Sequence, residues 1–297
     1  MPTNDDERHF SQLIAAAADD ELDTVKQIHA ERPHLLRRTT YNEGRSIVHV
    51  AAVSRSSGVL RFLASLQSSG RTNEGRKGGA EGGVLLDFCQ VGLDGMNPLH
   101  LACSQGSSRH SALTCCQVLC ELDSVDLCAL NGQGRTAIHI AGERGDMEAA
   151  RYLFGKCPQS AALACNIGQN ALQRAAAFGR LPIVQLLVKA QQIDLNAKDE
   201  EVGETDPRPN GPSLRDFIPR MQGNTALALA LAGSRTAAEE VSSFLLKQRG
   251  IKVNSTNSDG QTPSEMASKR NMAAVSSRIQ RLSYIELRTQ NLLGIGA

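Results

Sequence analysis

The chain has 297 residues, of which 41% are hydrophobic and 21% charged, and its 32 basic and 31 acidic side chains give a formal net charge of +1. This composition is typical of a folded globular protein and excludes disorder throughout the chain. The near-neutral balance lacks the excess of Lys and Arg found in proteins that bind nucleic acids or anionic membranes, so we expect neither partner. Aromatic residues make up only 3%, which favours a core of Ala, Leu, Val and Ile between closely packed helices.

The N-terminal segment gives no sign of export. Met1 to Phe10 contains three acidic residues and no apolar stretch of the kind found in secretory signals. The most apolar segment, Thr225 to Ala232, is far shorter than the roughly 18 residues that a membrane-spanning helix needs. We expect a cytoplasmic protein, which could also be nuclear, without membrane insertion.

The first predicted elements are two helices within residues 6–36. Phe10, Leu13 and Ala17 recur at helical spacing, and Val25 and Ile28 do so again after a short polar break. This segment has the periodicity of a helix pair that buries one face of each helix.

A glycine-led motif then recurs along the chain. Gly44-Arg45-Ser46-Ile47-Val48-His49-Val50-Ala51 has close copies at 95–102 and 134–141 and weaker copies that begin at Gly168, Gly223 and Gly260. A second motif follows at 145–153 and 179–187. The paired motifs resemble the ankyrin repeat family, whose first helix opens with T-P-L-H-x-A and whose period is about 33 residues. The resemblance implies an all-α ankyrin-repeat solenoid, built from helix-turn-helix repeats with β-turn fingers.

Most intervals between the motif glycines exceed that period, which indicates two loop insertions within one ankyrin-repeat domain over 1–297. Taken in chain order, we expect an N-terminal cap at 6–36, a repeat at 42–67, a Gly-rich insert at 68–90, repeats at 92–130, 131–164 and 165–197, a Pro-rich acidic insert at 198–220, a repeat at 221–256, a C-terminal cap at 257–284 and a tail at 285–297 that can extend the last helix. Each repeat buries its apolar face only by stacking on its neighbours.

The residue at the head of each motif suits a helix N-cap, because its side-chain oxygen can accept an unpaired backbone N–H. These residues are Ser46, Asn97, Thr136, Asn170, Thr225 and Thr262. Small residues such as Ala51, Ala102, Ala141 and Ala176 should let the paired helices approach closely.

Three motif histidines, His49, His100 and His139, have two interpretations. They could be metal ligands or catalytic bases, or they could bond the backbone between repeats. Successive repeats place them about 8–10 Å apart, too far to share one metal, which favours the structural role.

The eight cysteines include no C-x-x-C pair. Cys116 and Cys120 lie one helical turn apart and could bind a metal or sense redox state, but they alternate with apolar residues as buried structural cysteines do. We predict no metal site and no cofactor.

We predict that the chain is not an enzyme, since neither a G-x-S-x-G elbow nor a P-loop is present. The resemblance implies a monomer that binds a partner protein along the concave groove of its repeats. Matching the family's variable positions gives nine candidate partner-binding residues. Five are expected at turn tips, Arg45, Met96, Gln133, Arg135 and Gln169, and four at the ends of first helices, Gln105, Glu143, Arg144 and Phe178. Their Arg and aromatic members are of the kind enriched at interface hot spots.

Two other functions stay open. The chain could be a regulatory or adaptor subunit that binds through its insertions, or part of the organisation of a larger multi-component protein. Ile193-Asp194-Leu195-Asn196-Ala197 also resembles the inter-repeat turn that asparaginyl hydroxylases modify, which makes Asn196 a candidate modification site. The alternative is an asparagine that only stabilises its turn.

Overall fold

The computed structural model describes residues 4–40, 44–71, 86–105, 112–190, 192–199 and 223–292. Regular structure within these ranges is helical, with one isolated β-bridge between Thr39 and Ser46. The contacts divide the chain into two compact units, Met1–Ser160 and Ala161–Ala297.

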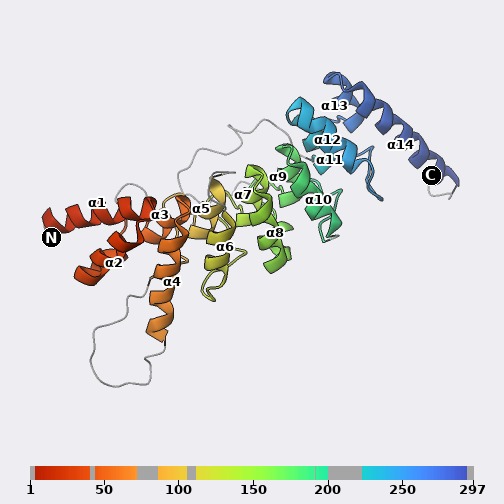
Figure 1. The fold of residues 1–297 in the computed structure, drawn as a ribbon. Helices are drawn as coiled ribbons and strands as arrows, with labels where there is room; N and C mark the ends of the chain where they lie inside the picture. The colour runs from red at the N-terminus through yellow and green to blue at the C-terminus, as the bar shows by residue number, and fades with distance from the viewer. Residues whose placement is uncertain are drawn as a thin grey trace. The chain divides into compact units, whose positions relative to one another are not determined.

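The N-terminal unit consists of helices in consecutive pairs. They are α1 (Asn4–Ala18), α2 (Leu22–Glu31), the short 3₁₀ helix η1 (Pro33–Arg37), α3 (Ile47–Val53), α4 (Ser57–Arg71), α5 (Pro98–Ser104), α6 (Ala112–Cys120), α7 (Ala137–Arg144) and α8 (Met147–Lys156). The first helices α1, α3, α5 and α7 lie side by side, and the second helices α2, α4, α6 and α8 form an adjacent row (Figure 1).

The C-terminal unit repeats this arrangement. It contains α9 (Ala171–Ala177), α10 (Leu181–Lys189), α11 (Ala226–Ala232), α12 (Arg235–Leu245), α13 (Pro263–Lys269) and α14 (Ala273–Leu292), and the 3₁₀ helix η2 (Pro158–Ala161) spans the division between the units. First helices pack on first helices, α9 on α11 and α11 on α13, while α10 packs on α12 and α12 on α14. This two-row stacking is the all-α solenoid expected from the repeats.

Alanines at the ends of the motifs allow this close packing. Ala51, Ala102, Ala141 and Ala176 are all 0% exposed, as the sequence predicts. The cores of both units consist mainly of Ala, Leu, Ile and Val.

All six predicted residues, Ser46, Asn97, Thr136, Asn170, Thr225 and Thr262, lie at the N-cap of a first helix. The predicted side-chain hydrogen bond to a backbone N–H is formed by Asn97, Asn170, Thr225 and Thr262, whereas the hydroxyls of Ser46 and Thr136 bond the rings of His49 and His139. In five of these helices the third residue completes a capping box, because its side chain accepts the backbone N–H of the N-cap residue. Only α11 lacks this second bond, since its third residue is Ala228.

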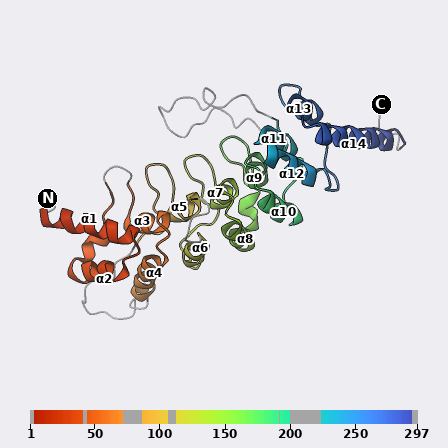
Figure 2. The same ribbon diagram turned by 45° about the horizontal axis from the view of Figure 1, so that its top comes forward.

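The loop before each motif forms a tight finger. In one finger the Asn131 N–H donates to the Arg135 carbonyl at 3.0 Å and the Gly134 N–H donates to the Asn131 carbonyl at 2.8 Å. The same two bonds recur at the fingers that end in Gly95, Gly168 and Gly260. Each finger glycine has a positive φ, for example +68° at Gly134, which explains why this position is glycine. The fingers of the N-terminal unit extend from the row of first helices (Figure 2).

The predicted Gly-rich insert 68–90 is too long at both ends. Helix α4 continues to Arg71, and Leu86 and Phe88 are buried, 4% and 1% exposed. Leu86 lies nine residues before its finger glycine, the position that the buried Val125 takes in the next repeat. The central part of the predicted insert, 72–85, lies outside the described residues, as does 200–222 of the Pro-rich insert.

The predicted end of the C-terminal cap at residue 284 is not the end of a helix. Helix α14 continues to Leu292, so the first part of the predicted tail extends it.

Candidate functional site

In the N-terminal unit the structure joins some of the predicted partner-binding residues into ion pairs. Arg135 on a finger arm pairs with Glu143 in the last turn of α7, with 2.9 Å between Nη1 and Oε2. Arg45 pairs with Asp94 of the next finger at 3.4 Å. Arg135, Glu143 and Arg45 are half-buried, and Asp94 is exposed. The first pair joins a finger to its helix, and the second pair joins two neighbouring fingers.

Other predicted residues of this unit are open to solvent. Gln133 at a finger tip, Gln105 as the C-cap of α5 and Arg144 as the last residue of α7 are exposed. Met96 and Arg135, which we expected at turn tips, instead lie just after the finger glycines on the arms that lead into the helices. The side chains available to a partner here are therefore Gln105, Gln133 and Arg144.

Sequence reasoning missed three exposed apolar side chains on the fingers. Leu93 is 78% exposed, Val91 55% and Leu130 52%. Val91 and Leu130 are equivalent, each four residues before its finger glycine, and Leu93 lies against Gly44 of the preceding finger. We call Val91, Leu93 and Leu130 the apolar finger strip. No pattern in the sequence distinguishes these exposed apolar residues from the buried Leu86 and Val125 of the same loops.

In the C-terminal unit the predicted Gln169 is not at a turn tip and is not available to a partner. It is 7% exposed, and its Nε2 donates to Asp199 Oδ2 at 3.1 Å. Burial raises the pKa of the Asp199 carboxyl, which also accepts the backbone N–H of Asn224. Gln169 therefore fastens one finger to the next.

Phe178 is exposed as predicted, 43%, at the C-cap of α9. The Arg174 guanidinium lies 4.9 Å from the centre of its ring and also donates to Gln169 Oε1 at 3.4 Å. The Phe178 ring thus lies against the Arg174 guanidinium, which Gln169 holds in place, and the contact is of the cation–π type.

The ends of the Pro-rich insert meet in an ordinary finger. The Asp199 N–H donates to the Asn224 carbonyl at 2.9 Å, and the Gly223 N–H donates to the Asp199 carbonyl at 2.8 Å. These are the two bonds of the other fingers. In the sequence, residues 200–222 therefore occupy the positions between the two arms of a finger, where the other fingers have their tip residues.

The comparison with protein families agrees with this architecture. The family model described as ankyrin repeats (three copies) matches residues 78–159 and 108–199. Residues 78–199 consist of ankyrin repeats. No curated protein matches the sequence.

The motif histidines have the predicted structural role. His100 Nδ1 accepts the Asn97 N–H at 3.3 Å, and its Nε2 bonds the Ala129 carbonyl of the following loop at 3.0 Å. The Nδ1 atoms of His49 and His139 accept the N–H of Ser46 and Thr136. Burial lowers the pKa of His49 and of His100, which keeps both rings neutral. In the described part of the chain, no group of three or more His, Cys, Asp or Glu side chains is placed to hold a metal ion.

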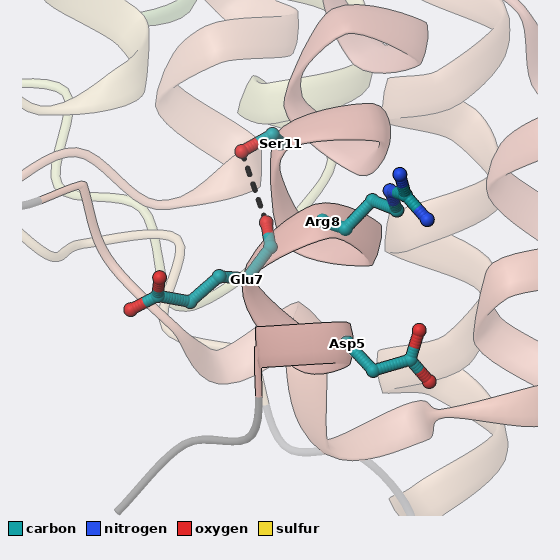
Figure 3. A pocket seen from close by; sticks show the side chains of 4 residues that line it. All are labelled: Asp5, Glu7, Arg8 and Ser11. Atoms are coloured by element: carbon teal, nitrogen blue, oxygen red, sulfur yellow. Dashed lines mark hydrogen bonds between the residues drawn. The ribbon is translucent and has the colours of Figure 1, made fainter.

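Open cavities in the described part of the chain include one on α1 and one beside Asn196. The cavity on α1, about 500 Å³, is lined by Asp5, Glu7, Arg8 and Ser11, with the Ser11 hydroxyl donating to the Glu7 carbonyl (Figure 3). The Asp5 carboxylate there is already paired with Arg32.

Among the helices that the structure describes, none is both long and apolar enough to span a membrane.

Asn196, the candidate modification site, lines another of these cavities. Its Nδ2 donates to the Gly250 carbonyl at 2.8 Å, and its Oδ1 accepts the Lys252 N–H at 2.7 Å. Its own N–H donates to Asp194 Oδ1 at 2.9 Å. Asn196 therefore joins its turn to the loop that follows α12, besides stabilising the turn.

Proposed function

We propose that the chain is a non-enzymatic interaction module that holds a partner protein in the groove between its fingers and the ends of its first helices. The observation that carries the proposal is the apolar finger strip, where Val91, Leu93 and Leu130 are each more than half exposed. Val91 and Leu130 hold equivalent positions of neighbouring fingers, and exposed apolar surface rimmed by polar residues marks interaction sites. The family supports the proposal, since ankyrin repeats generally mediate protein–protein contacts.

The polar part of the proposed surface consists of Gln105, Gln133 and Arg144 in the N-terminal unit. Arg144 follows Glu143, which Arg135 holds against the finger arm. A fixed backbone at this position reduces the entropy lost when Arg144 binds a partner. In the C-terminal unit Phe178, held by Arg174, provides an aromatic anchor of its own.

The test is an affinity capture with the full chain, followed by quantitative mass spectrometry. We expect a protein that wild type enriches to be lost from a variant that combines Leu93→Ser with Arg144→Ala. The matched control is Arg151→Ala, which removes an exposed Arg from the second helix α8. Equal enrichment by all three folded chains would reject the proposed surface.

A second candidate function has its own support. Because 199 and 223–224 close as an ordinary finger, residues 200–222 take the place of a finger tip in the sequence. An adaptor could then dock through this segment. Replacing 200–222 by Gly-Gln, the residues at 132–133 in the finger that precedes α7, should abolish capture in this case and leave it unchanged if the groove alone binds.

Hydroxylation of Asn196 stays a proposal that rests on the family resemblance. The bonds of Asn196 to Gly250 and Lys252 must open before an enzyme can reach the residue. Mass spectrometry of the Asn196 peptide from native cells tests the proposal, which predicts one added oxygen. A peptide of unmodified mass contradicts it.

A further inference from the structure

Two cysteines of the N-terminal unit face each other across successive repeats. Cys128 lies in the loop that leads to the finger tip at 132–133, and Cys157 is the C-cap of α8. Their Sγ atoms are 3.1 Å apart. The sulfurs of a disulfide are about 2.05 Å apart, so closure requires an approach of only about 1 Å.

The position of Cys128 is one that joins repeats elsewhere in the chain. The Cys128 N–H donates to Asp126 Oδ1 at 2.9 Å, just as the Asn196 N–H donates to Asp194 Oδ1 at 2.9 Å. The Asn196 side chain then bonds the loop after the next second helix. Cys128 likewise reaches the residue after the next second helix, and there the contact is sulfur to sulfur. The loop geometry thus holds the two thiols together.

We propose that Cys128 and Cys157 are a reversible redox pair, which closes to an intramolecular disulfide on exposure to a small-molecule disulfide such as oxidised glutathione. The bond would join the α6–α7 loop covalently to the end of α8.

The chemistry is two successive thiol–disulfide exchanges. The Cys128 thiolate attacks one sulfur of oxidised glutathione, which forms a mixed disulfide and releases one glutathione thiolate. The Cys157 thiolate then attacks the Cys128 sulfur, which forms the Cys128–Cys157 bond and releases the second glutathione. The two protons lost by the cysteines and the two electrons go to the two glutathione molecules, so the protein pair is oxidised and glutathione is reduced.

Access decides which sulfur reacts first. Cys128 is half-buried, whereas Cys157 is 5% exposed, so the oxidant enters at Cys128. Burial and the neighbouring Cys157 sulfur raise the pKa of the Cys128 thiol to about 11. Only a small fraction is therefore thiolate at neutral pH, and exchange requires excess oxidant and long incubation.

A second close pair serves as a control. Cys103 and Cys116 have Sγ atoms 3.7 Å apart and are both 0% exposed between α5 and α6. An oxidant cannot reach these thiols in the folded chain, so we expect them to stay reduced under the same conditions.

The experiment incubates the reduced full chain with excess oxidised glutathione, blocks the remaining thiols under denaturing conditions and maps disulfides by mass spectrometry. Trypsin with a Glu-specific protease releases residues 122–135 and 157–174, and fragmentation of the linked peptides assigns the sulfurs. We expect a Cys128–Cys157 link that dithiothreitol reverses, with Cys103 and Cys116 alkylated. Glutathione on the exposed Cys89 alone, or a link of Cys157 to Cys120, overturns the proposal.

A second measurement can be made on the wild-type protein. Phenylarsine oxide bridges two thiols only when they lie close together, so under native conditions it should protect Cys128 and Cys157 from alkylation. Cys128→Ser should abolish both the link and this protection, whereas Cys103→Ser should keep both. Absence of protection in wild type contradicts the proposal.

Oxidation should also raise the melting temperature of wild type but not of Cys128→Ser, because the link restricts the unfolded chain.

Discussion

His100 and Gln173 make the same pair of hydrogen bonds in different repeats. His100 Nδ1 accepts the N–H of its N-cap residue and Nε2 bonds the Ala129 carbonyl at 3.0 Å. Gln173 Oε1 accepts the N–H of its own N-cap residue and Nε2 donates to the Ala197 carbonyl at 3.0 Å. A histidine at this position therefore serves as a ring that can accept on one side and donate on the other.

This equivalence predicts the effect of substitutions at His100. His100→Ala removes both bonds and leaves a cavity, so we expect the free energy of unfolding to fall by about 2–4 kcal/mol. His100→Gln restores both bonds and should cost less than about 1.5 kcal/mol. Urea denaturation of the two variants provides the measurement. Equal losses of stability in the two variants would show that the two hydrogen bonds of His100 contribute little to the free energy of unfolding.

The buried histidines also predict a pH dependence. Burial lowers the pKa of His49 and of His100 below 6.5, the ordinary pKa of a histidine side chain. Below pH 6.5 these two side chains therefore bind protons more readily in the unfolded chain than in the folded chain. Stability from this source is complete above pH 6.5 and is lost as the pH falls toward the folded-state pKa. The Asp199 carboxyl, whose pKa is raised, acts in the opposite direction.

His100→Gln isolates the contribution of one ring, because Asp199 titrates in both proteins. Urea denaturation at pH 7.5 and pH 5 should show a smaller loss of stability in His100→Gln than in wild type. An identical loss would mean that His100 does not titrate differently in the folded and unfolded chains.

At the scale of an element, two fingers with the same backbone have different surroundings. Gly95 and Gly260 have φ of +71° and +72°. A Cβ added at Gly95 would lie 2.5 Å from the Gly132 backbone nitrogen, whereas a Cβ added at Gly260 would meet nothing within 4 Å. The finger of Gly95 therefore packs backbone against backbone on the finger that follows it.

Both Gly→Ala variants should lose about 1–2 kcal/mol from the left-handed backbone. Gly95→Ala should lose a further 1–3 kcal/mol or so, because the neighbouring finger must move. Thermal and urea denaturation of the two variants tests this difference. If Gly260→Ala is as destabilising as Gly95→Ala, contact between fingers contributes little to stability.

The repeated elements could be predicted from the sequence because their signals are local. The N-cap residues and the finger glycines lie within a few residues of the turns that require them. The burial of Gln169 could not be predicted in this way, since its partner Asp199 is 30 residues away. The ends of the Gly-rich insert were misplaced because a polar composition does not show that α4 continues to Arg71 or that Leu86 is buried.

At the scale of the whole N-terminal unit, the Arg55 side chain contacts several helix pairs. Its side chain is 2% exposed, donates to the Ala102 carbonyl at 3.4 Å and pairs with Asp146 at 3.5 Å. Asp146 in turn caps α8 by accepting the Ala149 N–H at 3.1 Å. One buried guanidinium thus connects the loop after α3 with α5 and the start of α8.

Arg55→Ala should lower the free energy of unfolding by about 3–5 kcal/mol, because it leaves a buried carboxylate without its cation. Arg61→Ala, which removes an exposed Arg from α4, should change it by no more than about 0.5 kcal/mol. The comparison is made by urea denaturation. A small effect of Arg55→Ala would indicate that water replaces the guanidinium at Asp146.

The surface that we propose for binding on the N-terminal unit was only partly predictable. Gln105, Gln133 and Arg144 are exposed as expected, whereas the apolar finger strip emerged only from the exposure of Val91, Leu93 and Leu130. Single apolar residues in a turn carry no sequence signal of burial or exposure. Their grouping depends on the stacking of neighbouring fingers.

The most direct test of the central claim is the dissociation constant of the captured partner for variants of the full chain. Leu93→Ser and Arg144→Ala should each weaken binding at least tenfold, equivalent to about 1.4 kcal/mol, with little change in melting temperature. Arg151→Ala on α8 should bind as wild type does. If both finger-side variants keep the wild-type dissociation constant while folded, the partner does not bind the proposed surface.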